Sequence, residues 1–178
     1  MQQVAVLGVD DALLTAARGG DQAAFERLIT PHIAAGHRLA AAILNDSGHA
    51  EDCVQEALQR AWRSMRQLRS GASTRVWFLA IVGNRARSMK RTRWWSVVRL
   101  PDASGSTNPA DTVAEHEDLT QALARLSPEE RAAVHLYFYE DLKSHEVGAA
   151  LGITASAARS RIHRALRQLR IDLTEEVL

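Results

Sequence analysis

The residues best suited to bind a ligand lie near the C-terminus, in the stretch LGITASAARSRIHRALRQLR at 151–170. If this stretch is a helix, its apolar residues fall on one narrow stripe and its polar and basic residues face the other way. Guanidinium groups bind phosphate, and guanidinium, imidazole and hydroxyl groups can also hydrogen-bond to the edges of DNA bases. The residues of this polar and basic face are Ser156, Arg159, Ser160, His163, Arg164 and Arg167.

The preceding residues, SHEVGAALGIT at 144–154, predict a first helix and a tight turn that position this face. Gly152 suits the turn, and the hydroxyl of Thr154 can cap the second helix. Together they predict a helix-turn-helix, whose second helix enters the major groove of DNA. A helical hairpin that only packs is the alternative, because small alanine-rich sequences often imitate the motif. The predicted DNA-binding surface comprises Thr154 at its start, the base readers Ser156, Arg159, Ser160 and His163, and the phosphate contacts Arg164 and Arg167.

Charge is segregated along the chain, although the formal net charge is only +1. Acidic residues are absent between Ala57 and Pro101, whereas the segment 102–118 contains acidic residues and no lysine or arginine. A solvated helix face usually mixes both signs, so a long stretch of one sign indicates an anionic partner such as a polyphosphate backbone. The basic residues of the acid-free stretch are Arg60, Arg63, Arg66, Arg69, Arg75, Arg85, Arg87, Lys90, Arg91, Arg93 and Arg99.

Other function classes find little support in the composition. The 178 residues include one cysteine, Cys53, so no internal disulfide can form, which fits a reducing, cytoplasmic setting. The N-terminus lacks a signal-peptide pattern, and no stretch approaches the roughly 18 apolar residues of a membrane span. His49 and Cys53 have a metal-compatible spacing, but no second pair completes a site. Without a phosphate-binding glycine loop or a catalytic constellation, we expect no metal, no cofactor and no enzyme activity.

Helical periodicity without alternating strands predicts an all-α protein of two small helical domains joined by a flexible linker. We expect a first domain at 10–95, an acidic linker rich in proline, glycine and serine at 96–116, and the helix-turn-helix domain at 117–171.

Local signals predict several helix boundaries. Asp21 can cap a helix that Pro31 restarts or kinks, and SPEE at 127–130 forms a capping box. A further helix is expected from about 75 to 93, with Trp94 and Trp95 just beyond it.

Several sequence segments, in their order and spacing, resemble those of the extracytoplasmic-function (ECF) sigma factors of the sigma-70 family. They are DQAAFERL, AEDCVQEALQRAW at 50–62, VWFLAIVGNRARSMKR at 76–91, ALARLSPEERAAVHLYFYEDLKSHEVGAALGIT and SRIHRALRQLR. The resemblance implies a subunit that binds core RNA polymerase and directs promoter-specific transcription initiation. The first domain would dock on polymerase and recognise and melt the −10 element, and the second would recognise the −35 element. It also implies an anti-sigma factor as a further partner.

The resemblance assigns roles to the matching residues. AEDCVQEAL resembles the segment that docks on the clamp of core polymerase, and the matching positions are Glu51, Asp52, Gln55 and Glu56. The following loop and helix resemble the part that opens and reads the −10 element. The matching positions there are Arg66, Arg69, Ser70, Asn84, Arg85, Arg87, Lys90, Arg91 and Arg93.

Three departures from the family pattern carry consequences. Lys143 stands where a serine usually caps the first helix of the helix-turn-helix, so Ser144 or Asp141 would have to substitute. Ala158 is smaller than the usual residue, and Gly83 weakens its helix by about 1 kcal/mol relative to alanine.

Two rival hypotheses for the function remain. A stand-alone helix-turn-helix regulator without polymerase docking does not explain the acid-free stretch, and a helical adaptor that binds only proteins does not explain the arginine segregation.

Overall fold

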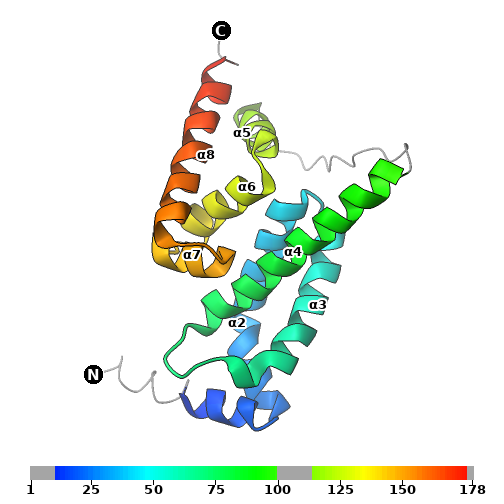
Figure 1. Cartoon of the computed structure of the whole chain (residues 1–178), viewed down its shortest axis with the longest axis vertical. Coiled ribbons are helices and arrows are strands. Elements are labelled where there is room, and N and C mark those ends of the chain that lie inside the picture. Colours follow the sequence, from blue (N-terminus) through cyan, green and yellow to red (C-terminus); the bar gives the residue numbers. More distant parts are fainter. Residues whose placement is uncertain (1–10, 100–113, 176–178) are drawn as a thin grey trace.

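The computed structural model describes residues 11–99 and 114–175, and every regular element within them is a helix (Figure 1). The all-α prediction is therefore confirmed. A short helix at 11–18 precedes two groups of helices, one on each side of residues 100–113. The first group comprises α2 (Gln22–Leu44), α3 (Ser47–Ser64), the 3-10 turn η1 (Met65–Gln67) and α4 (Thr74–Arg99). The second comprises α5 (Ala114–Arg125), α6 (Pro128–Val134), the π-helical turn η2 (His135–Tyr139), α7 (Ser144–Leu151) and α8 (Ala155–Glu175).

The long helix α2 runs unbroken through Pro31, so the helix does not restart there. Its start is as predicted, because the Asp21 carboxylate accepts the N–H of Ala24 at 3.0 Å. Pro31 is exposed, and apolar side chains on both sides of it, from Phe25 to Leu44, are buried. Burial of that whole face against α3 and α4 outweighs the backbone hydrogen bond that proline removes.

Helix α4 continues to Arg99 instead of ending near residue 93. The sequence contains no glycine or proline between Gly83 and the end of the helix, so nothing local stops it. Trp94 and Trp95 are therefore helical, and their side chains, like that of Arg93, lie outside the described part of the chain. Both α4 and α5 thus extend into the predicted linker at 96–116.

The predicted helix-turn-helix is present and consists of α7 and α8. Gly152 ends α7 in the left-handed conformation, with φ of 68°, which favours glycine. The hydroxyl of Thr154 accepts the N–H of Ala157 at 3.1 Å and so caps α8. Two strong local signals therefore fix the angle between the two helices.

Of two further helix starts, that of α6 has the predicted cap and that of α7 has a different one. Ser127 and Glu130 form the predicted capping box of α6. At the start of α7, neither Ser144 nor Asp141 supplies the cap. Instead, the carboxylate of Glu146 accepts the backbone N–H of Lys143 at 2.9 Å, which is half of a capping box.

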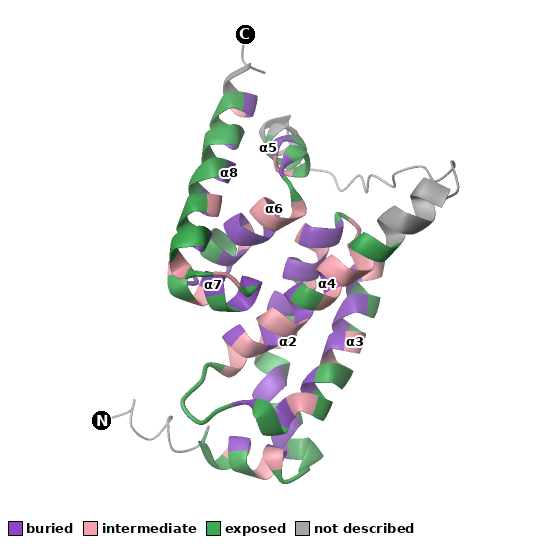
Figure 2. Cartoon of the chain, viewed as in Figure 1, coloured by how far each residue is buried: buried purple, intermediate pink, exposed green. Residues whose placement is uncertain are grey.

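The two groups pack directly on each other, with α7 against α4 and with α6 and η2 against α2 (Figure 1). Buried side chains form one continuous core through both groups, which joins Leu39 and Phe78 to Leu136 and Val147 (Figure 2). Gly83 faces this contact, and a Cβ there would lie 3.8 Å from the carbonyl oxygen of Ala150 in α7, so the packing also leaves room for alanine. A second, smaller core between α5, α6 and α8 consists of Ala122, Leu126, Val134, Ala165 and Leu169.

Two glycine-to-alanine substitutions should change the free energy of unfolding in opposite directions. A Cβ at Gly148 in α7 would lie 2.8 Å from the carbonyl oxygen of Ile153, so Gly148→Ala should destabilise the protein by about 1–2 kcal/mol. At Gly83 the nearest atom would be 3.5 Å away, so Gly83→Ala should stabilise by up to about 1 kcal/mol through helix propensity. Urea unfolding followed by circular dichroism measures both changes. Effects of the same sign would contradict this packing.

Candidate nucleic-acid interface

The predicted DNA-reading residues lie together on one exposed face of α8. Ala158, Ile162, Ala165 and Leu169 are buried beneath this face, against the other helices of the second group. The Thr154 hydroxyl is engaged in capping, so this residue fixes where the face begins. The exposed side chains are Ser156, Arg159, Ser160, His163, Arg164 and Arg167.

Arg164 has one weak internal contact. Its Nε lies 3.9 Å from Oε1 of Glu130, and its side chain remains 61% exposed. An exposed pair of this length contributes little to stability, so the guanidinium group stays available to an anionic ligand.

The loop between η1 and α4 carries predicted −10 residues and is held by a residue that sequence reasoning missed. Arg18, at the end of the helix at 11–18, donates to the carbonyl oxygen of Leu68 and, at 3.1 Å, to the hydroxyl of Ser70. Arg66 in turn donates from Nε to the carbonyl oxygen of Arg18 at 3.4 Å. Arg66 in η1 and the loop residues Arg69 and Ser70 are all exposed. No sequence signal other than a basic residue at a helix end marks Arg18.

The basic residues of α4 do not form one outward face. Arg85 donates from Nη2 to the Glu56 carboxylate at 2.6 Å, and Lys90 donates to the carbonyl oxygen of Ile43 at 3.3 Å. Arg91 is exposed, as is the amide of Asn84. The expected row of phosphate contacts along α4 is therefore divided between internal and external positions.

Arg87 is turned toward the second helical group. Its Nη2 donates to Oδ1 of Asn84 at 2.6 Å, and its Nη1 is buried without a hydrogen-bond partner. Burial lowers the pKa of Arg87; Glu129 partly offsets this effect, and Arg161 adds to it. Both of these neighbours belong to the second group, so Arg87 lies at the junction between the groups.

An accessible cationic row exists elsewhere, along the second half of α3 and the loop that follows it. Arg60, Arg63, Arg66 and Arg69 recur every third residue, and all four are exposed. The acid-free stretch thus does present a positive face, but mainly on α3 and the loop.

The predicted polymerase-docking residues lie on the first half of α3. Glu51, Asp52 and Gln55 are exposed, whereas Glu56 is half-buried and paired with Arg85.

Behind these residues Cys53 is fully buried, and burial raises the pKa of its thiol to about 11. Cys53 is therefore a core residue, as predicted, and His49 pairs with Asp46 at 2.7 Å. Within the described residues, no three His, Cys, Asp or Glu side chains cluster as metal ligands would.

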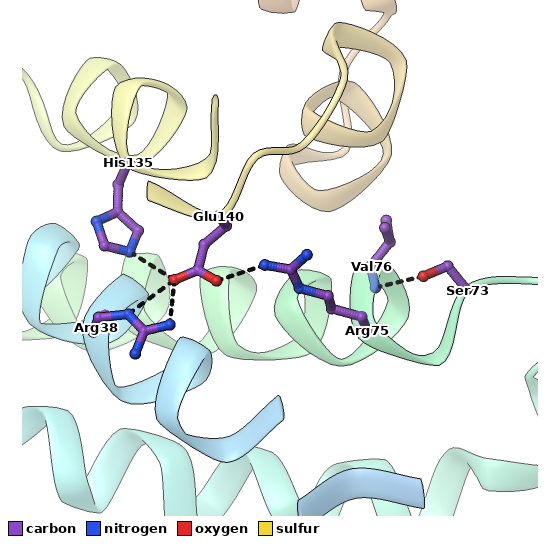
Figure 3. A network of polar contacts seen from close by, with 6 residues as sticks. All are labelled: Arg38, Ser73, Arg75, Val76, His135 and Glu140. Atoms are coloured by element: carbon purple, nitrogen blue, oxygen red, sulfur yellow. Dashed lines mark hydrogen bonds and ion pairs between the residues drawn. The ribbon is translucent and has the colours of Figure 1, made fainter. Parts of the chain in front are cut away.

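A buried polar network at the junction of the groups was not predicted (Figure 3). The Glu140 side chain is 1% exposed. Its carboxylate accepts from Nη2 of Arg75 at 2.7 Å and from Nε of Arg38 at 3.0 Å, and Nε2 of His135 lies 3.4 Å away. Burial alone would raise the pKa of Glu140, but the hydrogen bonds from Arg75 and Arg38 hold it below its ordinary value. Burial lowers the pKa of His135, and the neighbouring Glu140 partly offsets this effect.

Among the helices that the structure describes, none is long and apolar enough to cross a membrane.

The two helical groups each match a known family of domains. Residues 28–96 match sigma-70 region 2, and residues 122–170 match sigma-70 region 4.

Curated proteins of similar length show the same relationship. The chain is 32% identical over 171 residues to the ECF RNA polymerase sigma factor SigL of Mycobacterium tuberculosis, with 92% of this chain and 97% of SigL covered. It is 29% identical over 153 residues to the RNA polymerase sigma factor SigV of Bacillus subtilis, with 84% and 91% covered.

Solved structures share the fold. The sigma factor RpoE, in complex with the anti-sigma factor NepR from Bartonella quintana, matches with a TM-score of 0.73 and 25% identity over 84% of this chain and 96% of RpoE. CnrH, in complex with the cytosolic domain of CnrY, matches with a TM-score of 0.70 and 22% identity over 94% and 98%. From its two matched regions and its full-length relatives, the chain belongs to the ECF sigma factors of the sigma-70 family, non-enzymatic RNA polymerase subunits that direct promoter-specific transcription initiation.

Proposed function

We propose that the chain holds core RNA polymerase through α3 and reads two separate promoter elements through its two helical groups, in the cytoplasm. In this proposal 10–95 forms region 2, 96–116 the linker and 117–171 region 4, consistent with the family matches at 28–96 and 122–170. The observation that carries it is the exposed polar and basic face of α8 on a helix-turn-helix with a well-capped second helix.

Region 4 reads the −35 element with α8. Residues of its first turns, Ser156, Arg159, Ser160 and His163, face base edges in the major groove, because a recognition helix presents its N-terminal end to the bases. Arg164 and Arg167 lie farther along and hold phosphates.

Region 2 reads and opens the −10 element with the loop at 68–73 and the exposed groups beside it. Unpaired bases need polar pockets and cations along the backbone. The hydroxyl of Ser70, the guanidinium of Arg69 and the amide of Asn84 supply such groups. The exposed row from Arg60 to Arg69 tracks the phosphates of the opened strand.

Core polymerase is held by the acidic half of α3. Glu51, Asp52 and Gln55 give an exposed carboxylate and amide surface that suits a basic protein partner. Glu56 belongs to the same segment, but its ion pair with Arg85 gives it a structural part as well. An anti-sigma factor is a further proposed partner, supported by the likeness to RpoE in complex with the anti-sigma factor NepR.

The direct experiment is promoter-dependent run-off transcription with purified core polymerase, on fragments selected by the reconstituted holoenzyme. We expect new start sites that require this chain. Tight binding to duplex DNA without polymerase, and no added initiation, would instead support a stand-alone helix-turn-helix regulator.

Arg164→Ala should weaken holoenzyme binding to every promoter fragment by a similar factor. The loss of one phosphate contact should lower the slope of log K against log salt by about one unit. Filter binding at several salt concentrations measures this slope, with the exposed Arg27→Ala on α2 as the control. A changed sequence preference at an unchanged slope would make Arg164 a base reader instead.

Asp52→Lys should reduce capture of core polymerase and leave the fold intact, since Asp52 is exposed. A charge reversal at a rim position mainly slows association, so surface plasmon resonance should show a lower on-rate at low salt. Glu56→Lys is a poor substitute because it would also place a second cation against Arg85. Unchanged binding by Asp52→Lys would remove this residue from the docking surface.

Arg18→Ala should free the loop at 68–73 without removing any of the proposed DNA-binding side chains. Losing the hydrogen bonds to Leu68 and Ser70 should speed hydrogen exchange of the loop amides about tenfold and reduce open-complex formation. Exchange detected by mass spectrometry and permanganate footprinting of unpaired thymines measure the two effects. Arg27→Ala serves as the control, and loop exchange equal to that of the unsubstituted protein would show that Arg18 does not hold the loop.

A further inference from the structure

The junction between the two helical groups is joined by charge as well as by packing. Glu140 comes from the second group, at the end of η2, whereas Arg38 lies on α2 and Arg75 at the start of α4 (Figure 3). One carboxylate that is 1% exposed therefore binds guanidinium groups from two helices of the other group, at 2.7 and 2.9 Å.

In this structure the second helical group packs on the first, an arrangement that we call closed. The closed arrangement covers part of the predicted −10 surface. A cleft of about 480 Å³ separates the loop and α4 from α7, with Arg69 and Trp77 on one wall and His145 and Glu146 on the other. Arg87 is turned into the junction, and Arg75, one residue past the start of α4, is bound to Glu140. Two guanidinium groups of α4, those of Arg75 and Arg87, are thus directed at protein groups instead of at a DNA strand.

The Glu140 carboxylate accepts a hydrogen bond from Arg75 that a DNA phosphate could accept in its place. Carboxylate and phosphate oxygens accept the same charge-assisted hydrogen bonds from guanidinium groups. A strand bound along the loop and the start of α4 would therefore compete with Glu140 for Arg75.

In the closed arrangement the two groups also cannot bind the −10 and −35 elements at the same time. Elements centred near −10 and −35 are about 25 base pairs apart, which is roughly 85 Å along the DNA at 3.4 Å per base pair. Here α7 lies directly against α4, and Gly152 joins α7 to the recognition helix α8. The two groups must separate before both elements can be bound.

We propose that Glu140 is an internal latch, a carboxylate that holds region 4 on region 2 and keeps Arg75 and Arg87 from DNA until the groups separate. This inference rests on the proposed −10 and −35 roles. The docking residues Glu51, Asp52 and Gln55 are exposed on α3, which packs mainly against α2 and α4. Polymerase can therefore capture the closed form, and promoter reading follows release of the latch.

The test uses the full chain with Glu140→Gln, which keeps the shape of the side chain but removes its charge. Hydrogen exchange measured without DNA or polymerase should be about tenfold faster, or more, in α7 and the first turns of α4, because two charge-assisted hydrogen bonds are weakened. Run-off transcription at limiting polymerase should rise. Glu26→Gln, the same charge change at an exposed site on α2, should alter neither result.

A second variant covers the case in which Glu140→Gln fails to fold. Arg38→Gln removes a partner of the latch that has no part in the proposed DNA or polymerase surfaces, and it should speed exchange in the same segments. In the double variant the two effects should not add, because both remove one interaction.

Two outcomes would overturn the latch. Unchanged exchange in α7 and α4 in both variants would show that Glu140 does not hold the groups together. Faster exchange with unchanged or lower initiation would show that the closed form does not restrain promoter reading. Exchange is measured without DNA, so failure of the latch is distinguishable from failure of the proposed promoter roles, which would appear as no initiation by the unsubstituted chain.

Discussion

One buried carboxylate, Glu140, joins the two helical groups across their shared apolar core. Removing an ionised side chain from water costs several kcal/mol unless cations and hydrogen-bond donors meet it in good geometry. Glu140 meets this condition where α2 and α4 bring Arg38 and Arg75 to it. Its backbone is fixed as well, because its N–H donates to the carbonyl oxygen of His135 and the next residue, Asp141, has a φ of 50°. A small rotation of the second group would leave a buried charge without partners, so the network specifies the orientation more than it adds stability.

The same constraint explains how the basic stretch is used. A long run of cations without acids predicted a polyanion partner, and the exposed row from Arg60 to Arg69 fits that prediction. Arg75 and Arg85, in contrast, bind carboxylates that lie 65 and 29 residues away along the chain. Periodicity identifies residues that share a face of a helix. It does not reveal whether a distant helix will cover that face, so the division between internal and external arginines could not be read from the sequence.

What the sequence predicted correctly was local. Asp21, Ser127, Gly152 and Thr154 act within three or four residues of their partners, and each shapes a helix end as expected. The helix-turn-helix and the exposed face of α8 follow from these signals and from the apolar stripe. Local signals were insufficient where tertiary burial overrides local preference, as at Pro31, or where a contact spans the chain. Arg18 and Glu140 belong to the second kind, with partners 52 and 102 residues away in sequence.

The composition of the junction suits a contact that forms and separates. Its closest approach uses small residues, with Gly83 and Ala80 of α4 facing Ala149 and Ala150 of α7. These small residues bury little apolar area themselves, whereas the larger side chains of Leu39, Phe78, Leu136 and Val147 are buried in the core that joins the groups. Interfaces between domains of one chain are in general more polar and weaker than domain cores. The apolar core that joins the groups is non-directional, so the charges around Glu140 carry much of the specificity of this contact. A partner that offers phosphates or a basic surface can therefore compete for the arginines or for the carboxylate without unfolding either group.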